Sequence, residues 1–219
     1  MPEIGWDSSW LAAIRRIRIV ACGTAYHAGM VGKFVLEELC RIPVEVDIAS
    51  EFRYRNPIID EQTLVLMISQ SGETLDTLAA MREARRRGGK ILAIVNVVGS
   101  SIAREADTVF YTGAGPEIAV ASTKAYNTQL AALYLIALDL ADRLGRLKKD
   151  KVREYLDLLS RLPDLLEKTL AAHDQIQRFA SAHFNARSIF FIGRGLDFAL
   201  SMEASLKLKE ISYIHSEAY

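Results

Sequence analysis

The chain has 219 residues, its 27 Lys and Arg are balanced by 27 Asp and Glu, and half of its residues are hydrophobic. This length builds one to two domains of about 100–200 residues each, and the balanced charge argues against a nucleic-acid binder that relies on bulk electrostatics. The most apolar stretch, 130–138, is shorter than the roughly 20 residues of a membrane span, and the N-terminus lacks a signal-peptide pattern. We therefore expect a cytoplasmic protein that binds neither nucleic acid nor membrane. Cys22 and Cys40 form neither a disulfide framework nor a metal-ligand pair, and no metal or cofactor is expected.

Strand-like and helix-like segments alternate from residue 18 to about residue 143. Strands are expected at 18–22, 44–48, 64–69, 91–96 and 108–111, and helices at 25–40, 74–87, 101–106 and 122–143. The segment 64–69 (LVLMIS) is apolar up to its last residue, as expected for a strand that is covered on both faces. Strict alternation predicts βαβ units, so the predicted fold class is α/β: a three-layer sandwich around a five-stranded parallel sheet.

A boundary is expected at Gly145 and the charged run that follows it. Residues 154–182 have the pattern of helix, interrupted at Pro163. The segment 188–192 (SIFFI) then returns to a strand, and a helix that contains 202–211 follows it.

The start of the chain and its last part resemble each other. RIVACGTAYHAG aligns with SIFFIGRGLDFA, which indicates a weak internal repeat. A single strand and helix cannot close a sheet, so the chain is expected to be a fragment of a duplicated α/β protein. The predicted units are a first domain at 12–145, a helical connector at 146–186, and the first strand and helix of a second domain at 187–219.

Three corners where a predicted strand meets a helix carry hydroxyls and small residues. They are 22–24 (CGT), 69–74 (SQSGET) and 121–123 (AST). Parallel sheets bind ligands outside the carboxyl ends of their strands, so these corners are expected to lie together. In the middle corner Ser71 suits an N-cap, Gly72 lets the backbone come close to a ligand, and Thr74 adds a hydroxyl. Free amides and the positive end of the helix dipole then favour an anion such as a phosphate monoester.

The plain interpretation of each corner is a helix cap and nothing more. Three corners at one sheet edge favour a small anionic ligand, but they do not name it. A nucleoside triphosphate or a dinucleotide is not favoured, because the sequence has no GxxxxGK[ST] and no GxGxxG after a strand.

Six segments, in the same order, resemble one family. They are ACGTAYHAGM (21–30), SEFRYRNP (50–57), SQSGETLDTL (69–78), AIVNVVGSSIAREAD (93–107), VASTKAYNTQLA (120–131) and LKLKEISYIHSEAY (206–219). From about residue 18 onward, the chain is similar to the sugar isomerase (SIS) half of glucosamine-6-phosphate synthase, the glutamine–fructose-6-phosphate transaminase (isomerizing). The resemblance implies two flavodoxin-like SIS subdomains, each with a five-stranded parallel sheet. This chain would hold the first subdomain and the start of the second.

The resemblance also implies a substrate. Fructose 6-phosphate would be converted to glucosamine 6-phosphate in amino-sugar biosynthesis, with its phosphate and sugar held at the three corners. Many members carry Ser where this chain has Ala25, so one phosphate contact is expected to be weaker. The residues implied as substrate ligands are Gly23, Thr24, Ser69, Gln70, Ser71, Thr74, Val120 and Ser122.

Glu203, Lys207 and Glu210 are spaced i, i+4 and i+7, so they share one face of the predicted helix. Spacing alone favours a surface ion pair that stabilises the helix by about 0.2–0.5 kcal/mol. The resemblance favours catalysis, because KLKEISYIH is similar to the stretch that carries the family's base. Glu210 would then move a proton between C1 and C2 of the open-chain sugar, and Lys207 would position the sugar or stabilise charge on its oxygens. Glu203 would support them through a hydrogen bond.

For the remaining reactive side chains, no catalytic role is predicted. His27 is expected to pack in the first helix, and His173 and His183 are expected to be solvated. His215 does not match the histidine that the family uses for ring opening. Cys22 has no evident neighbouring base and is not expected to be a nucleophile.

The full family enzyme also has a glutaminase domain, the ring-opening histidine and a Schiff-base lysine, none of which is found in this sequence. We therefore expect a chain that binds the sugar phosphate without carrying out the full synthesis, and the resemblance implies a homodimer. Two alternatives stay open: a non-catalytic SIS sensor of sugar phosphates, and an aldose–ketose phosphate isomerase without amino transfer.

Overall fold

The first unit is a parallel sheet of five strands, seen in a computed structural model that describes residues 7–219. The strand order is β2-β1-β3-β4-β5, the order of flavodoxin-like folds. The strands are β1 (Arg16–Ala21), β2 (Val44–Ile48), β3 (Thr63–Ser69), β4 (Lys90–Val95) and β5 (Thr108–Tyr111). Every residue of β3 is buried, which fits its apolar sequence. The predicted α/β fold class with a five-stranded parallel sheet is confirmed.

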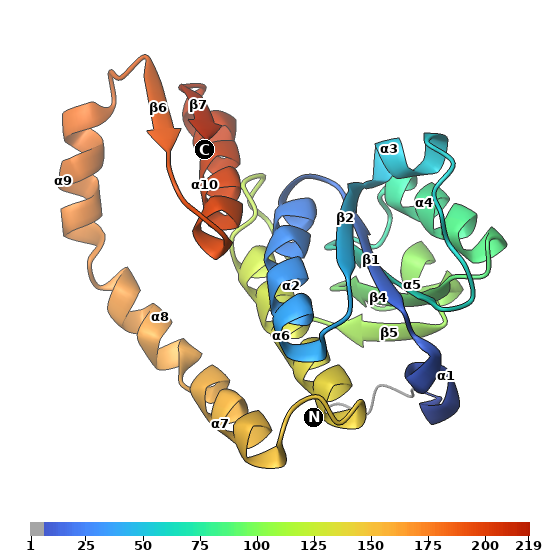
Figure 1. Cartoon of the computed structure of the whole chain (residues 1–219). Coiled ribbons are helices and arrows are strands. Elements are labelled where there is room, and N and C mark those ends of the chain that lie inside the picture. The colour runs from blue at the N-terminus through green and yellow to red at the C-terminus, as the bar shows by residue number, and fades with distance from the viewer. Residues whose placement is uncertain (1–6) are drawn as a thin grey trace.

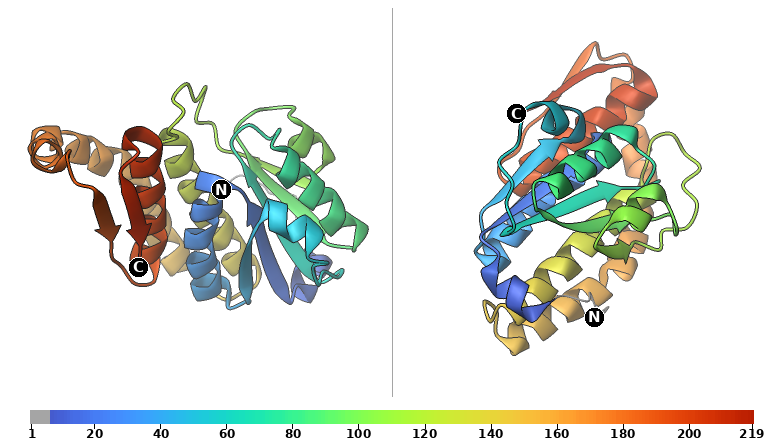
Figure 2. Two further views of the ribbon diagram at one scale, coloured as in Figure 1. Left: turned by 90° about the horizontal axis from the view of Figure 1, so that it is seen from above. Right: turned by 90° about the vertical axis from the view of Figure 1, so that its right-hand side faces the viewer.

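Helices cover both faces of this sheet, which makes three layers (Figure 1 and Figure 2). One face carries α2 (Gly23–Cys40) and α6 (Lys124–Arg143), which share a core with Ile19 and Leu66. The other face carries α3 (Ala49–Tyr54), α4 (Leu75–Arg86) and α5 (Ser101–Glu105), which share a core with Val20 and Met67. Consecutive strand residues point to opposite faces, so the apolar strands supply both cores.

The predicted elements of this unit are found with small shifts at their ends. The strands at 44–48 and 108–111 match residue for residue. Two helices were not predicted, α1 (Ser8–Ala13) and α3, and each has six residues. Such short helices offer less than two turns, so a helical hydrophobic period cannot show itself in their sequence.

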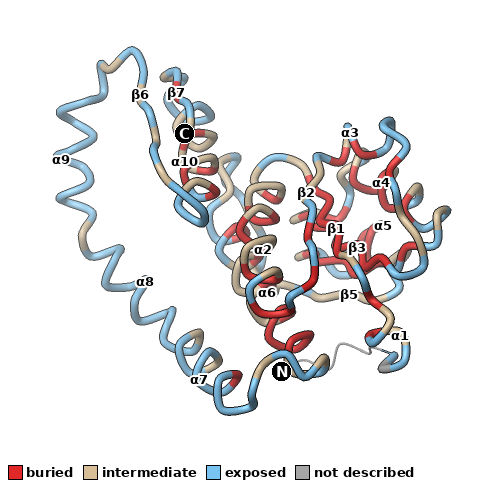
Figure 3. Tube along the Cα trace, in the orientation of Figure 1, coloured by how far each residue is buried: buried red, intermediate tan, exposed pale blue. Residues whose placement is uncertain are grey.

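Three helices after the first unit form an extended arm, shown in orange in Figure 1. They are α7 (Lys149–Ser160), α8 (Leu162–Leu170) and α9 (His173–His183). Pro163 lies in the first turn of α8, where proline is tolerated, and it accounts for the predicted interruption. Val152 is the only buried residue of these three helices, and most of the arm is exposed in Figure 3.

The last part of the chain is a strand, a helix and a second strand. β6 (Ser188–Phe191) pairs in parallel with β7 (His215–Ala218), and α10 (Leu196–Ser212) connects them. α10 packs against α2 of the first unit (Figure 2). Sequence analysis expected only a strand and a helix here, so β7 is an addition. Its residues, HSEA, include none of the Val, Ile, Thr, Tyr, Phe or Trp side chains that favour a strand.

Within residues 7–219, none of the helices combines the length and the hydropathy that a bilayer span requires.

Candidate functional site

A cavity of about 220 Å³ lies where β1 and β3 end. The corners after both strands contribute to it, and so does the segment that leads into α6. Six of the predicted ligands line it together: Thr24, Ser69, Gln70, Ser71, Thr74 and Ser122. The other lining residues are Cys22, Ala25, Ile68, Thr77 and Gln129. The hydroxyls expected to meet at this edge of the sheet therefore do meet, and no lysine or arginine is among the lining residues.

The turn between β3 and α4 is held by its own hydroxyls. Ser69 Oγ accepts a hydrogen bond from the Gly72 amide at 3.0 Å and lies 3.1 Å from Thr74 Oγ1. Gly72 has a φ of 66°, and a Cβ there would overlap the Ser100 hydroxyl. Only glycine fits this backbone position without strain. The turn therefore fixes the hydroxyls that face the cavity.

The first turn of α4 is open to an anion. Ser71 was predicted as the N-cap, and this was wrong, because α4 begins at Leu75 and its N-cap is Thr74. The left-handed turn at Gly72 delays the helix, so Ser71 Oγ instead accepts from the Glu73 amide at 3.2 Å. Thr74 makes no side-chain capping bond. Since its first amides lack a capping side chain, this helix of twelve residues presents its positive end at the cavity.

The acidic side chain nearest to this turn points elsewhere. Glu73 Oε1 accepts a hydrogen bond from the Ser101 amide at 2.7 Å, at the start of α5. The hydrogen bonds from Ser101 lower the pKa of Glu73 below its usual value, so the carboxylate is charged. Its charge is held at α5, and Glu73 is not among the residues that line the cavity.

Two predicted ligands lie outside the lining of the cavity. Gly23 begins α2 with a φ of 55°, and Val120 is 97% exposed in the segment before α6. Ser122 lines the cavity, and its Oγ donates to Glu117 Oε2 at 3.4 Å. The same carboxylate oxygen accepts from the Ala125 amide at 3.1 Å, so Glu117 caps α6. The start of α6 is therefore already occupied by a side chain, unlike the start of α4.

A second group of polar side chains lies between α2 and α10, and we call it the Glu203 cluster: Thr24, His27, Glu203, Lys207 and Glu210. Glu203 is 5% exposed. Its Oε1 accepts from Thr24 Oγ1 at 3.0 Å and lies 3.5 Å from Lys207 Nζ, and its Oε2 lies 2.7 Å from His27 Nδ1. Lys207 also pairs with Glu210. The predicted shared face of Glu203, Lys207 and Glu210 is therefore present.

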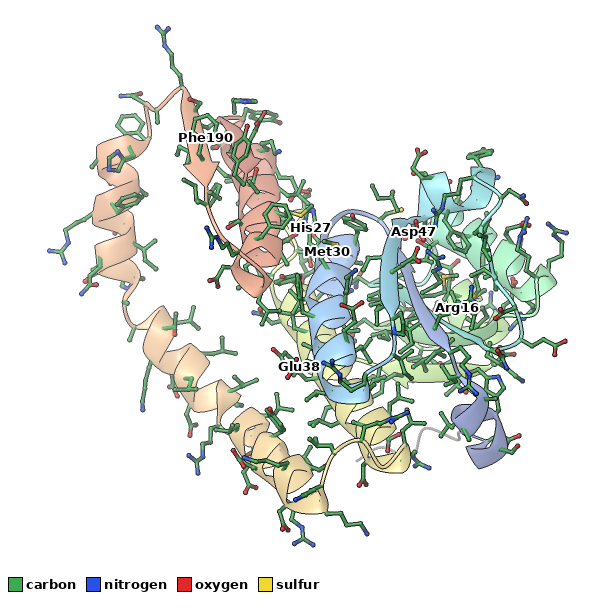
Figure 4. All side chains as sticks on the ribbon, in the orientation of Figure 1. Arg16, His27, Met30, Glu38, Asp47 and Phe190 are labelled. Atoms are coloured by element: carbon green, nitrogen blue, oxygen red, sulfur yellow. The ribbon has the colours of Figure 1, made fainter. Side chains whose placement is uncertain are left out.

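Thr24 joins the cavity to the Glu203 cluster, because it lines the first and donates to the second. Glu210 has a side chain that is 33% exposed, so a ligand can reach it, whereas that of Lys207 is 18% exposed. Figure 4 labels His27 on α2, beside α10. Thr24 and Glu203 thus link the cavity to the predicted acid–base pair.

Several polar residues of this region were missed or undervalued by sequence reasoning. His27 was expected only to pack, and it also contacts a buried carboxylate. Thr77 and Gln129 line the cavity, and Thr77 Oγ1 and Gln129 Oε1 are buried with no hydrogen-bond partner. Burial and the charge of Glu203 raise the pKa of Tyr126 to about 12, so its phenol is neutral. Polar residues on the apolar face of a helix were the available signal for all of these.

The other histidines lie apart from the cavity. His173 is 2.7 Å from Asp174, and the side chains of both are about three-quarters exposed. The His183 ring lies against the Phe179 ring in the exposed arm, tilted by 49°. His215 lies on β7, 3.4 Å from Glu217. Within residues 7–219, no three His, Cys, Asp or Glu side chains are grouped as metal ligands.

Comparison with known proteins identifies the family. The SIS domain profile matches residues 11–139, which is more than half of the chain. This chain belongs to the SIS domain family. The matched residues span the five-stranded sheet and most of α6.

The SIS chain also has close curated relatives. It is 64% identical over 209 residues to the glutamine–fructose-6-phosphate aminotransferase (isomerizing) of Caldanaerobacter subterraneus subsp. tengcongensis, covering 95% of this chain and 34% of the relative. It is 61% identical over its whole length to the protein of that name from Clostridium tetani, of which it covers 36%. The chain therefore spans about a third of the length of the curated relatives it matches.

A solved structure shows the same fold. The C-terminal domain of glucosamine–fructose-6-phosphate aminotransferase from Francisella tularensis superposes with a TM-score of 0.94 at 40% identity. The match covers 97% of this chain and 60% of that domain. The arm and the second unit are included in this match, because it covers nearly all of the chain.

Proposed function

We propose that this chain is the SIS part of a glutamine–fructose-6-phosphate aminotransferase (isomerizing), and that its cavity binds the phosphate of fructose 6-phosphate or glucosamine 6-phosphate. The observation that carries the proposal is the meeting of Ser69, Ser71, Thr74 and Ser122 on one cavity beside the open first turn of α4. The names of the curated relatives support the choice of sugar.

The phosphate is held by hydroxyls and amides. Ser71 and Thr74 donate to its oxygens, and the first amides of α4 add further donors along the helix dipole. A hydrogen bond to a charged group contributes about 1.5–3 kcal/mol, so several together account for selective binding of a dianion. Gln70 and Thr24 border the same space and orient the rest of the ligand.

Glu210 and Lys207 carry the chemistry in this proposal. Glu210 takes the proton from C1 of the open-chain ketose, the electrons of the C1–H bond form a C1–C2 double bond, and the π electrons of the C2 carbonyl move onto its oxygen. Glu210 then returns the proton to C2 while the proton of the C1 hydroxyl passes to the C2 oxygen, which leaves a carbonyl at C1. Lys207, which pairs with Glu210, stabilises the charge that develops on the sugar oxygen. A group that shuttles a proton must reach the ligand, and the side chain of Glu210 is the more exposed of the two.

The division of the chain follows from the same proposal. Residues 12–145 form the first SIS unit, 146–186 the connector, and 187–219 the start of a second unit. The proposal includes a homodimer and, in the longer protein, a glutaminase domain. The two-stranded β6–β7 sheet supports the second unit, because parallel sheets are normally covered on both faces and α10 packs against this one.

Isothermal titration of the 219-residue chain tests the ligand. Glucosamine 6-phosphate and fructose 6-phosphate are expected to bind saturably, and fructose without phosphate is not. Thr74→Val and Ser71→Ala are each expected to weaken binding by about tenfold, because each removes a donor to the phosphate. Ser160→Ala, on the arm, is the matched control. A folded chain that gives no saturable response to either sugar phosphate overturns the proposal.

The Glu210→Gln variant distinguishes a catalytic SIS unit from a non-catalytic sensor. If Glu210 is the base, the variant binds the ligand with an affinity within about threefold of wild type but slows exchange of the C1 proton with D₂O by about 10²–10⁴-fold. Proton NMR of fructose 6-phosphate measures that exchange. Equal exchange rates in the two proteins would point to a non-catalytic SIS module.

A further inference from the structure

Glu203 is a buried carboxylate that contacts side chains from two parts of the chain. Its side chain is 7% exposed, and it lies on α10 against α2. A buried carboxylate without donors is strongly destabilising, so its partners determine where it points. Here the partners are Thr24 and His27 from α2 and Lys207 from α10.

The two oxygens of Glu203 have different partners. Oε1 faces the Thr24 hydroxyl and the Lys207 ammonium, whereas Oε2 faces His27 Nδ1. Among the contacts of the described residues, His27 is therefore the partner that holds Oε2 and stops the carboxylate from rotating. The side chain of His27 is 12% exposed and its ring meets the Tyr26 ring edge-on, so the imidazole is itself held in place.

Lys207 lies between two carboxylates that compete for it. Its Nζ is 3.5 Å from Glu203 Oε1 and pairs more closely with Glu210. If Glu203 turned both oxygens toward Lys207, the ammonium would move away from Glu210. The 2.7 Å contact between His27 Nδ1 and Oε2 opposes this turn, so Lys207 stays beside Glu210, whose side chain is partly exposed.

We propose that His27 is a positioning residue for the Lys207–Glu210 pair and that it acts through Glu203. This inference rests on the proposed function, because it assigns the pair to the sugar end of the ligand. In this arrangement Nδ1 carries the hydrogen that Glu203 accepts, as in other histidines that are oriented by a carboxylate. His27 itself touches neither the phosphate nor the sugar.

The test compares two ligands that differ in what they reach. Inorganic phosphate fills only the phosphate corner, whereas glucosamine 6-phosphate also reaches Lys207 and Glu210. Amide chemical-shift titrations of the full 219-residue chain measure both affinities and report the fold of each variant. His27→Phe keeps a ring but has no donor, and it is expected to weaken glucosamine 6-phosphate binding by about tenfold, while inorganic phosphate changes by less than about twofold.

Conservative variants exclude a purely structural role. His27→Asn places an amide donor near the position of Nδ1 and is expected to restore most of the lost affinity. Glu203→Gln keeps the shape of the side chain but removes its charge, so it should show the same selective loss, and it serves as the test if His27→Phe does not fold. Lys33→Gln, on the same helix, is the control, and both affinities should stay at the wild-type values.

Three results would overturn the inference. Equal loss of both ligands in His27→Phe would mean that His27 only packs α2, and no loss of either would mean that it does not position the pair. Failure of His27→Asn to regain affinity would mean that the donor is not what matters. Failure of the proposed function looks different, since the wild-type chain would then bind glucosamine 6-phosphate no better than inorganic phosphate.

Discussion

Both α/β parts of this chain contain a strand that is followed by a helix, but their sheets are covered to different degrees. The first unit covers both faces of a five-stranded sheet, and β3 is buried at every residue. The second unit has two strands, and Phe190 of β6 is 56% exposed. Figure 3 shows buried segments in red throughout the first unit, whereas β6 of the second unit has none. Parallel sheets are normally covered on both faces, and the cavity lies in the unit whose sheet is covered in this way.

The largest expected contrast is in stability. Phe52→Ala empties a fully buried site in the first unit and is expected to lower the free energy of unfolding by about 3–5 kcal/mol. Phe190→Ala removes a half-exposed ring that contacts Tyr219, and is expected to cost less than about 1 kcal/mol. Urea denaturation followed by circular dichroism measures both. Equal losses would show that the second unit is as well packed as the first.

The next contrast concerns the turn that forms the cavity. Gly72→Ala and Gly99→Ala both place a side chain at a positive φ, which costs about 1–2 kcal/mol. At Gly72 the new Cβ also overlaps Ser100, whereas at Gly99 nothing lies within 4 Å. We expect Gly72→Ala to weaken sugar-phosphate binding by at least about tenfold, and Gly99→Ala to leave it nearly unchanged. Titration calorimetry measures both affinities. Similar affinities in the two variants would show that the overlap of the Gly72 position with Ser100 does not affect binding.

The smallest expected effect depends on pH. Hydrogen bonds from Arg86 and Arg87 lower the pKa of Glu83 on α4 to about 2. A lowered folded pKa stabilises the protein above the unfolded pKa of 4.5, and this contribution is lost as the pH falls toward 2. Glu83→Gln should therefore be less stable than wild type at pH 6, by under about 1 kcal/mol, since solvent screens the pair. The difference should shrink below pH 4.5.

A matched variant on the arm sharpens this prediction. Glu154 pairs with Lys151, and both side chains are more than half exposed. Glu154→Gln is therefore expected to change the unfolding curve very little at any pH. Urea denaturation between pH 3 and pH 6 compares the two variants. A larger effect of Glu154 than of Glu83 would reverse the contrast between the first unit and the arm.

Local pattern was enough to predict most of the first unit. A run of apolar residues indicates each buried strand, and Ser69 and Thr74 follow such a run. Their meeting at the cavity could therefore be predicted. The capping residue of α4 could not be predicted in this way, because the left-handed turn at Gly72 makes the helix begin later in the chain. A local Ser-x-x-Thr pattern looks the same whether the helix begins at once or three residues later.

Contacts between the units could not be read from local pattern. Thr24 and Glu203 are separated by 179 positions, and nothing near either residue indicates the other. His27 lies on a helix face that a histidine often shares with core residues, so packing was the reasonable prediction from sequence. Only the docking of α10 on α2 brings the imidazole to a buried carboxylate.

No basic side chain is among the residues that line the cavity, and this affects how an anion approaches it. Amide and hydroxyl dipoles have fields that fall off faster with distance than the field of an ammonium or guanidinium group. The lining of the cavity therefore guides the approach of an anion little from afar, and the Lys207 ammonium nearby is offset by Glu203 and Glu210, so added salt should alter the rate of capture only slightly. Such a cavity selects its ligand at contact, through the directions in which its donors point.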